Sequence, residues 1–391
     1  MNAGGVVVDM TGATEIRLDP AAGTVAVAAG TSLDELMRRT ISAGWFVPVT
    51  PGTRQVTVGG AIAADVHGKN HHRDGSFGRF VRSFELLSPG QGRVTVRRDA
   101  MPDVFDATAG GMGLTGVILE AELDLIPIES AFMRVDTERA SDLDDLMERM
   151  ESGDERARYS VAWVDCLSRG RHLGRGVLTL GDHATAEEAG ARDPLRFAPA
   201  SRPSVPPGVP SVLLRPATAR AFNELWFHKA PRSERARIRP LASFFHPLDG
   251  VRKWNRLYGP RGFVQYQLAV PFGAEEVVRA VVEELAIAEV PSYLAVLKRF
   301  GPGRGMLSFP IAGWTLAVDV PASARDLAPL LDGLDERIAA AGGRVYLAKD
   351  ARMRPELLPF MYPELDRWRG VRERLDPRRT MRSDLARRLG L

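Results

Sequence analysis

Residues 263–348 carry the pattern that most restricts what this chain can fold into. Two amphipathic segments with apolar residues at helical spacing, 275–289 and 326–341, alternate with four short apolar segments typical of strands: Phe263–Val270, Tyr293–Lys298, Trp314–Val320 and Arg344–Ala348. The order β-α-β-β-α-β is the split βαβ arrangement, in which helices cover one face of an antiparallel sheet. We therefore expect an α+β fold.

The other face of this predicted sheet is polar. Gln265 and Gln267 are two residues apart on the first strand, so they share a side, and Thr315, Ala317 and Asp319 do the same on the third. Plain exposure to solvent would explain such a face. The alternative is that it forms the roof of a polar ligand site.

Outside this region the pattern is weaker but still readable. A helix is predicted over Leu33–Ile41, begun by a Ser32–Glu35 capping box, and a second over Asp142–Met150. Segment 198–216 holds six prolines, so we expect a mobile loop or lid there. Further short segments are expected to be strands: Val6–Val8, Thr24–Val27, Ser83–Leu87, Arg93–Arg97 and Val117–Leu125.

Composition excludes several classes of protein. With 391 residues the chain is long enough for two or three domains, and it has no apolar run long enough for a transmembrane helix. We expect no signal peptide in this sequence, because its first residues show neither a basic n-region nor a long apolar segment. Cys166 is alone, so neither an internal disulfide nor a cysteine metal site is expected. The net charge of +3 is too small to indicate a nucleic-acid partner.

The basic residues are unevenly placed. Segment 220–239 holds six Lys or Arg against two acids, and segment 367–388 holds nine Arg against three. A solvated surface explains both clusters, and attraction to an anionic surface or a phosphate-bearing substrate is the alternative. Arg is the default cation, and Lys, which can lose its proton, occurs only at Lys69, Lys229, Lys253, Lys298 and Lys349.

The densest stretch of special residues runs from 51 to 72. Gly52, Gly59 and Gly60 permit close backbone approach, small side chains at 61, 63 and 64 leave room beside a flat ligand, and successive N–H groups in such a loop can hold phosphate oxygens. The stretch matches neither a Walker loop nor G-x-G-x-x-G, and a generic turn would also explain its glycines. A second small-residue loop, 109–116, favours one extended ligand shared by both loops.

Three histidines follow the glycines, at His67, His71 and His72. Histidines at i and i+4 can bind zinc, but no Glu lies between them and no Cys is near. We expect no metal here, and a packed or hydrogen-bonded His67 is the plainer reading.

The stretch from Pro48 to His72 resembles the flavin-binding domain of the vanillyl-alcohol-oxidase (PCMH-type) superfamily, and more closely that of the decaprenylphosphoryl-β-D-ribose 2′-oxidase family. The resemblance covers nearly the whole chain. It continues in order through Phe244–Asp249, Trp254–Arg256, Tyr258–Pro260, Gln265–Gln267, Leu307–Pro310, Gly313–Trp314 and Ala348–Asp350.

This resemblance implies two domains with the active site between them. A PCMH-type FAD-binding domain would take residues 1–130 and 344–391 and hold FAD noncovalently, and a substrate domain with the split βαβ sheet would take 131–343. Lys349 and His67 would be catalytic. Substrate contacts would come from Gln265, Gln267, Lys298, Thr315, Phe245 and Trp163. Cofactor contacts would come from Pro51, Gly52, Thr53, Arg54, Thr57, Gly59, Gly60, Ala63, Ala64, His67, Gly68, Asn70, His71, Gly111, Gly116, Val117 and Tyr346.

The chain departs from the family pattern at three places. Ala317 and Ala64 stand where the family has Cys, so inhibitors that need the strand thiol should not bond covalently. The family's flavin domain opens with an Arg-Gly-x-Gly-Arg-Ser-Tyr-Gly-Asp loop, and this chain begins just after it. We expect a misassigned start or a truncated gene, the alternative being a naturally shortened protein with weak FAD binding. An incomplete domain predicts poor solubility.

The implied reaction is oxidation of the ribose 2′-hydroxyl of a polyprenylphosphoryl-β-D-ribose to the 2′-keto intermediate. It is the first half of epimerisation to the arabinose donor for cell-wall arabinan. Two alternatives stay open: a sugar-1,4-lactone or alditol oxidase, and a flavin-free remnant that binds lipid-linked sugar. The implied partners are a short-chain NADH-dependent keto-reductase and the cell membrane, bound peripherally on a face that the sequence leaves open.

Overall fold

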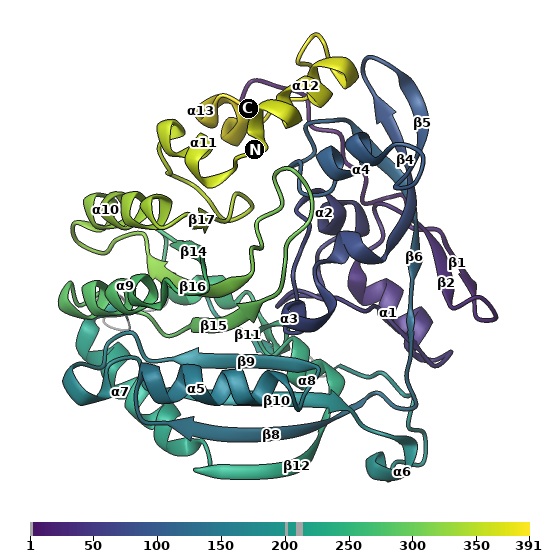
Figure 1. Cartoon of the computed structure of the whole chain (residues 1–391). Coiled ribbons are helices and arrows are strands. Elements are labelled where there is room, and N and C mark those ends of the chain that lie inside the picture. The colour runs from purple at the N-terminus through teal and green to yellow at the C-terminus, as the bar shows by residue number, and fades with distance from the viewer. Residues whose placement is uncertain (1–2, 200–201, 209–213) are drawn as a thin grey trace.

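Two antiparallel sheets organise the computed structural model, which describes residues 3–199, 202–208 and 214–391. One has five strands in the order β1-β2-β6-β4-β5, and the other has eight in the order β12-β8-β10-β9-β15-β16-β14-β17. Figure 1 shows the two sheets side by side, with the N-terminal strands in the first and most of the middle of the chain in the second. The α+β fold expected from the sequence is confirmed.

The first sheet contains β1 (Ile16–Asp19), β2 (Thr24–Ala28), β4 (Val81–Ser88), β5 (Gly92–Arg97) and β6 (Val117–Asp124). Its helices are α1 (Leu33–Ile41), α2 (Val58–Ala63) and α4 (Pro102–Thr108). α1 begins as predicted, since the Ser32 hydroxyl accepts from the N–H of Glu35 while the Glu35 carboxylate accepts from the N–H of Ser32.

The strand predicted over Val6–Val8 is wrong. These three valines are irregular, and their exposed fractions are 88%, 70% and 64%. No strand of the described residues pairs with them. Without a partner strand for its backbone hydrogen bonds, this apolar triplet does not form a strand.

The second sheet contains the predicted split βαβ unit. Its strands β14 (Phe263–Pro271), β15 (Ala295–Phe300), β16 (Gly313–Pro321) and β17 (Arg344–Val345) lie in the order β15-β16-β14-β17. α9 (Glu275–Ile287) and α10 (Leu327–Ala340) bury their apolar stripes. β17 is shorter than predicted because the chain turns after Val345, where the N–H of Lys349 donates to the Tyr346 carbonyl.

Four further strands extend this sheet: β8 (Phe132–Ala140), β9 (Tyr159–Val164), β10 (Gly176–His183) and β12 (Ser233–Pro240). α5 (Leu143–Asp154) packs on β8, β9 and β10, confirming the helix predicted from Asp142. The remaining helices and strands are β3 (Trp45–Phe46), α3 (His71–Asp74), β7 (Ile126–Pro127), α6 (Ala186–Ala189), β11 (Arg202–Ser204), α7 (Pro216–Lys229), α8 (Leu241–Phe245) and β13 (Val251–Arg252).

Part of the proline-rich segment 198–216 forms an element, contrary to the expectation of a loop. β11 pairs in parallel with β13, and the N–H of Val205 donates to the Arg252 carbonyl at 2.9 Å. This ladder satisfies backbone groups that a free loop would leave to water. Residues 200–201 and 209–213 of the predicted loop lie outside the described residues.

The end of the chain returns to the first sheet through α11 (Leu358–Met361), α12 (Leu365–Leu375) and α13 (Asp384–Leu389), drawn in yellow in Figure 1. The buried Trp368 indole donates to the Ala107 carbonyl at 2.9 Å, and the Ser88 hydroxyl donates to the Leu375 carbonyl at 2.5 Å. This return supports our proposed division into 1–130 with 344–391 and 131–343.

Candidate active site

The polar face of the second sheet is covered by the first domain. The β14–β16 register places Gln267 opposite Ala317 and Gln265 opposite Asp319, and the β15–β16 register places Lys298 opposite Thr315. Gln267, Thr315 and Asp319 are at most 3% exposed. Plain exposure to solvent therefore does not explain this face, and the ligand-site reading gains support.

His67 is the residue that reaches this face from the first domain. The Gln267 amide donates to His67 Nε2 at 2.9 Å and to the Thr315 hydroxyl at 3.1 Å. Thr315 gives its own proton to the Leu268 carbonyl at 2.8 Å, so it must accept from Gln267, which fixes the orientation of the amide. His67 Nε2 is then an acceptor, and the imidazole proton resides on Nδ1.

Aromatic rings enclose the other sides of His67. The ring centroids of Phe300, Tyr346 and Phe309 lie 4.7, 5.7 and 6.0 Å from that of the imidazole. The Tyr346 hydroxyl donates to the Ala64 carbonyl at 3.0 Å, which ties the C-terminal segment to the glycine-rich stretch. Burial, followed by the charges of Lys298 and Lys349, lowers the pKa of His67 well below its ordinary range.

Lys298 and Lys349 lie at this face, and Lys69, whose Nζ donates to the Phe244 carbonyl in the neighbouring aromatic core, is near enough for its charge to act on Lys298. Lys298 Nζ lies 3.5 Å from His67 Nδ1, and burial together with the charges of Lys349 and Lys69 lowers its pKa to about 7. Burial also lowers the pKa of Lys349, against the opposing charge of Asp319. Burial likewise lowers the pKa of Lys69, to about 7. Neutral amines near ambient pH can take up a proton, and charged ones would attract an anion.

Asp319 and Gln265 complete the face. The Gln265 amide donates to Asp319 Oδ1 at 2.9 Å, while Asp319 Oδ2 has no partner in the described part of the chain. Burial raises the pKa of Asp319, and the Gln265 hydrogen bond and the Lys349 charge oppose that rise. Trp163 joins the same face, because its register partner Val296 stands opposite Ala317.

The predicted flavin stretch is a loop that leads into α2. Thr57 caps the helix, and the N–H groups of Gly59 and Gly60 donate to the Ala29 carbonyl at 2.8 Å and to the Thr57 hydroxyl at 3.2 Å. These two N–H groups are therefore already used within the fold, and phosphate contacts of this stretch stay a prediction for its other groups. Gly52 and Gly60 are exposed, and a Cβ at Gly52 would meet nothing within 4 Å.

An ionic clamp holds this loop after Pro51. Asp249 accepts from the Thr53 hydroxyl at 2.7 Å and from the Arg54 N–H at 2.8 Å. The buried Arg54 guanidinium lies between Asp249 and Asp34, at 3.4 and 2.5 Å. The clamp joins segments far apart in sequence, so it fixes the loop against the second domain.

The second small-residue loop lies against the end of α2. The N–H groups of Gly110 and Met112 donate to the carbonyls of Ile62 and Ala63 at 3.0 and 2.9 Å. Gly116 has φ +152°, and a Cβ there would lie 2.6 Å from the Leu87 carbonyl oxygen. Both loops therefore meet beside Ala63 and Ala64, as expected for one shared ligand, and Gly111 and Val117 lie on the same loop and at the start of β6.

Two predicted groups lie behind this surface. Asn70 donates to the Pro48 carbonyl at 2.9 Å next to Gly68, and His71 packs against Phe300 at 4.5 Å with a pKa that burial lowers to about 3. Phe245 is 2% exposed, with the Phe46 and Tyr159 rings 5.3 and 4.8 Å away. The structure places Phe245 in this aromatic core and does not bring it to the polar face.

Sequence reasoning assigned no role to Asp65, which is buried beneath the flavin stretch. It accepts from the Ser76 hydroxyl at 2.7 Å, from the Gly78 N–H at 2.9 Å and from the Ser308 hydroxyl. An acid among small apolar residues signals burial, but no local pattern points to Ser308. Asp319 shared the predicted polar side of its strand with Thr315, and that alternation was the available signal.

The site fits FAD in this structure. Gly60, Ala63 and Ala64 share one open side of α2 and its end, and with Gly52 they give a glycine-rich floor without bulky side chains; the buried Gln267 Oε1 has no partner among the described residues. A planar, polar, anionic group would use these features. Within 3–199, 202–208 and 214–391, no group of three or more His, Cys, Asp or Glu could hold a metal ion.

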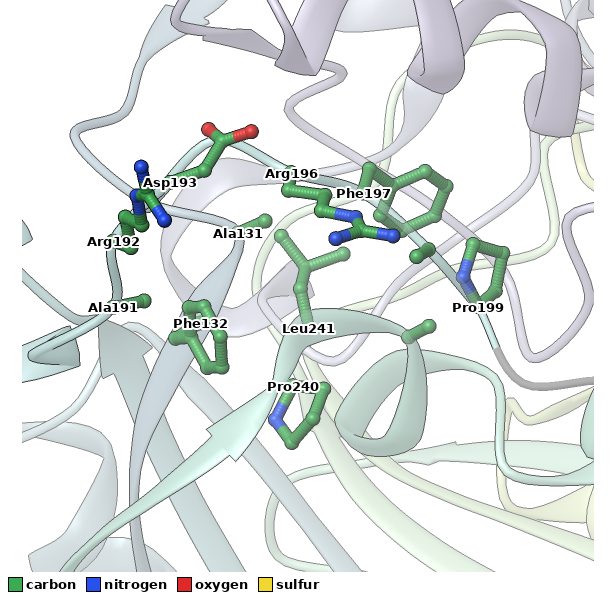
Figure 2. Close-up of a pocket in the computed structure, with 12 residues that line it drawn as sticks. Ala131, Phe132, Ala191, Arg192, Asp193, Arg196, Phe197, Pro199, Pro240 and Leu241 are labelled. Carbon is green, nitrogen blue, oxygen red and sulfur yellow. The ribbon is translucent and has the colours of Figure 1, made fainter.

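A separate pocket of about 560 Å³ lies between segment 191–199, the start of β8 and α8. Figure 2 draws the residues that line it. Its charged lining consists of Arg192, Asp193 and Arg196, and none of the polar-face residues lines it. In the part of the chain that the structure describes, no helix is long and apolar enough to cross a membrane.

Comparison with known proteins agrees with this geometry. Residues 1–97 match an FAD binding domain family. A decaprenylphosphoryl-β-D-ribose oxidase of Mycolicibacterium smegmatis is 42% identical over 398 residues, covering 100% of this chain and 86% of the relative. An uncharacterized protein in the mprA 5′ region of Streptomyces coelicolor is 46% identical over 371 residues, covering 92% and 100%. A probable L-gulonolactone oxidase 6 of Arabidopsis thaliana is 29% identical over 33% of this chain and 23% of its own.

Proposed function

Because the chain belongs to the decaprenylphosphoryl-β-D-ribose oxidase family of FAD-dependent oxidoreductases, we propose that it oxidises the ribose 2′-hydroxyl of a polyprenylphosphoryl-β-D-ribose to a ketone. The observation that carries the proposal is the face shared by His67, Gln267 and Lys298 beside the glycine-rich floor. It offers cations for a phosphate, amides for a sugar, and amines that can take a proton.

FAD, when bound, supplies the hydride acceptor. Contacts along the flavin would come from Pro51, Gly52, Thr53, Arg54, Thr57, Gly59, Gly60, Ala63, Ala64, Gly68, Asn70, His71, Gly111, Gly116, Val117 and Tyr346. The glycine-rich stretch and the second small-residue loop, 109–116, meet beside α2, which supports one extended binding surface.

Removal of the hydroxyl proton is assigned to Lys349, with His67 as the second candidate. The lone pair on His67 Nε2 already accepts from Gln267, and burial opposes a charge on this imidazole. The lowered pKa of Lys349 makes its neutral amine more populated, and Asp319 would stabilise the ammonium formed when the proton arrives. Tyr346 and Phe309 stack at 4.6 Å beside His67 and would limit the access of water to that side of the site.

Substrate orientation is assigned to Gln265, Gln267, Lys298, Thr315 and Trp163. Lys298 lies beside His67. An anionic group bound there would stabilise the ammonium form of Lys298, which burial and the charges of Lys349 and Lys69 disfavour. The Gln267 Oε1 atom has no partner in the described structure and would accept from a sugar hydroxyl. Phe245 would not contact the substrate directly and would support the site only by packing in the aromatic core with Tyr159.

The product is a ketone, so a keto-reductase is the class of enzyme that must consume it to complete an epimerisation. We propose a short-chain NADH-dependent reductase as that partner. A polyprenyl substrate would be presented at a membrane, which this chain would meet as a peripheral protein.

Purified protein is mixed without oxygen with a short-chain prenylphosphoryl ribose, a sugar-1,4-lactone or an alditol, and the flavin absorbance is followed. Bleaching by the prenylphosphoryl ribose alone, with a product lacking two hydrogen atoms, is expected. Bleaching by the lactone or alditol alone would overturn the proposal in favour of a soluble substrate. Protein lacking flavin absorbance would favour a flavin-free binding protein.

The Lys349 assignment has its own test. Lys349→Met should retain flavin and fold but lose flavin reduction, because no amine remains to take the hydroxyl proton. Wild-type reduction rates in this variant would move the role to His67.

A further inference from the structure

The helix α7 carries an apolar stripe that the fold leaves uncovered. Phe222, Leu225 and Trp226 are 39%, 69% and 44% exposed, and their i, i+3, i+4 spacing puts them on one side of the helix. Phe222 and Trp226 stack at 5.9 Å and form a continuous aromatic surface. Large exposed apolar side chains grouped in this way mark a contact surface.

The adjoining side of α7, which carries Asn223, anchors the helix to the second domain. The buried Asn223 amide donates to Asp165 Oδ1 at 2.8 Å and to the Ser292 carbonyl at 3.1 Å. Arg175 lies over the Phe227 ring at 4.7 Å. The stripe is therefore held outward on a fixed helix, which Figure 1 shows at one end of the eight-stranded sheet.

Lys229 lies beside the stripe, and most cations of α7 and of the segment that touches its start have no acidic partner; Arg220, which pairs with Glu289, is the exception among these described residues. Segments 214–232 and 251–262 contain eight Lys or Arg against one acid, Glu224. The two segments touch, since Leu214 Cδ1 lies 4.0 Å from the position of a Cβ on Gly259. The described residues place no carboxylate within 4 Å of Arg215, Lys229, Lys253 or Arg261, and Lys229 lies 5.8 Å from the Trp226 ring.

The basic segment 367–388 is partly neutralised, since five of its nine Arg pair with acids within the described residues. Arg367 pairs with Asp103 and Glu364, Arg369 with Asp366, and Arg388 with Asp350. On β12, Arg235 pairs with Asp136. In the described part of the chain, cations without an acidic partner are thus a larger share around α7, at seven of eight, than in segment 367–388, at four of nine.

The stripe is also continuous with the polar face of the active site. Phe222 packs edge-on against Tyr293 at 5.2 Å, and the Tyr293 carbonyl accepts from the Trp163 indole at 3.1 Å. Trp163 pairs with Val296, which is two residues before Lys298 on the same face of β15. Half-buried apolar side chains therefore lead from α7 to the cations beside His67.

We propose that α7 docks on the surface of an anionic lipid bilayer through Phe222, Leu225 and Trp226, with Lys229 and its neighbouring cations at the headgroups. Exposed apolar side chains enter the headgroup boundary while cations pair with anionic lipids. The route through Tyr293 and Trp163 then brings a membrane-held prenyl chain toward Lys298. Only this last step rests on the proposed function.

Sedimentation with phosphatidylglycerol vesicles, using phosphatidylcholine vesicles for comparison, tests docking without any substrate. Wild-type protein should bind the anionic vesicles preferentially, and less so at high salt. Leu225→Glu should weaken binding roughly tenfold or more, because it adds a charge at the boundary. Phe360→Glu is the matched control, since Phe360 on α11 is equally exposed at 71% and should bind as wild type does.

Failure of wild-type protein to bind anionic vesicles would overturn the proposal, as would equal losses in the two variants. If Leu225→Glu changed the oligomeric state without changing vesicle binding, α7 would be an interface between copies. Each variant is also assayed for flavin content and for oxidation of a detergent-dispersed short-chain substrate, so that loss of the proposed oxidase activity is distinguished from loss of docking.

Discussion

Replacing Asp65 by Ala should destabilise the fold by about 4 kcal/mol. Three hydrogen bonds to the buried carboxylate disappear, from Ser76, Gly78 and Ser308, at roughly 1 kcal/mol each. Asp65 also has φ +40°, a left-handed conformation that costs Ala about 1 kcal/mol more than Asp or Asn. Because the next residues lead to His67, the flavin stretch should loosen too.

Asp65→Asn separates hydrogen bonding from charge. Its carbonyl can accept from Gly78, its amide can donate to the two serine hydroxyls after they rotate, and Asn tolerates the left-handed backbone. The loss should stay within about 1 kcal/mol. Burial raises the pKa of Asp65, so the wild type loses stability as pH rises through that pKa, whereas the Asn variant does not.

Urea unfolding followed by far-ultraviolet circular dichroism, repeated between about pH 4 and pH 7, gives these differences. As the pH rises, the free energy of unfolding of the Asn variant should increase relative to that of the wild type. The reasoning is refuted if the Ala variant lies within about 1 kcal/mol of wild type, or if the Asn variant falls as far as the Ala variant.

Three further changes test the site. Between about pH 7 and pH 10 the unfolded chain binds a proton that folded Lys298 does not, so stability should rise with pH in the wild type relative to Lys298→Met in urea titrations. Gln267→Leu removes the hydrogen bond that fixes the His67 tautomer and should lower kcat roughly tenfold, while Gln265→Leu removes a hydrogen bond to Asp319 instead and should lower kcat less; equal kcat values would contradict a role for the Gln267–His67 hydrogen bond. Asp249→Ala leaves buried Arg54 with one acidic partner and should lower the free energy of unfolding, measured by urea titration, by about 3 kcal/mol. An unchanged unfolding midpoint would show that the ionic clamp does not stabilise the fold.

Local patterns predicted those parts of the fold in which one side of each element is buried. The capping box of α1 and the alternation of β14 and β16 each depend on residues close together in the sequence, so they can be recognised from the sequence alone. β9 and β10 were missed because residues on both their faces are largely buried, which removes the alternation.

β12 was missed for the opposite reason. It is an exposed edge strand rich in arginine, and edge strands carry such charges to avoid pairing with other chains. A charged edge strand looks like solvated surface in the sequence, and solvated surface was one of the two interpretations left open for segment 220–239.

The site depends on contacts that no local pattern contains. His67 and Gln267 are 200 residues apart, and Asp65 and Ser308 are 243 apart. Family resemblance pointed to the first pair, but nothing pointed to the second. The resemblance also placed Phe245 among substrate contacts, whereas packing with Tyr159 places it in a core.

The return of the C-terminal helices to the first sheet has a consequence during translation. Trp368, which fills the space beside Ala107, is separated from it by 261 residues. At about 5–20 residues per second, the ribosome delivers the tryptophan roughly 13 to 50 s after its neighbour. During that interval the first sheet and α4 lack the C-terminal helices, and the apolar surface that Trp368 covers is exposed. Ribosome-associated chaperones should therefore bind the nascent chain before the second domain is complete.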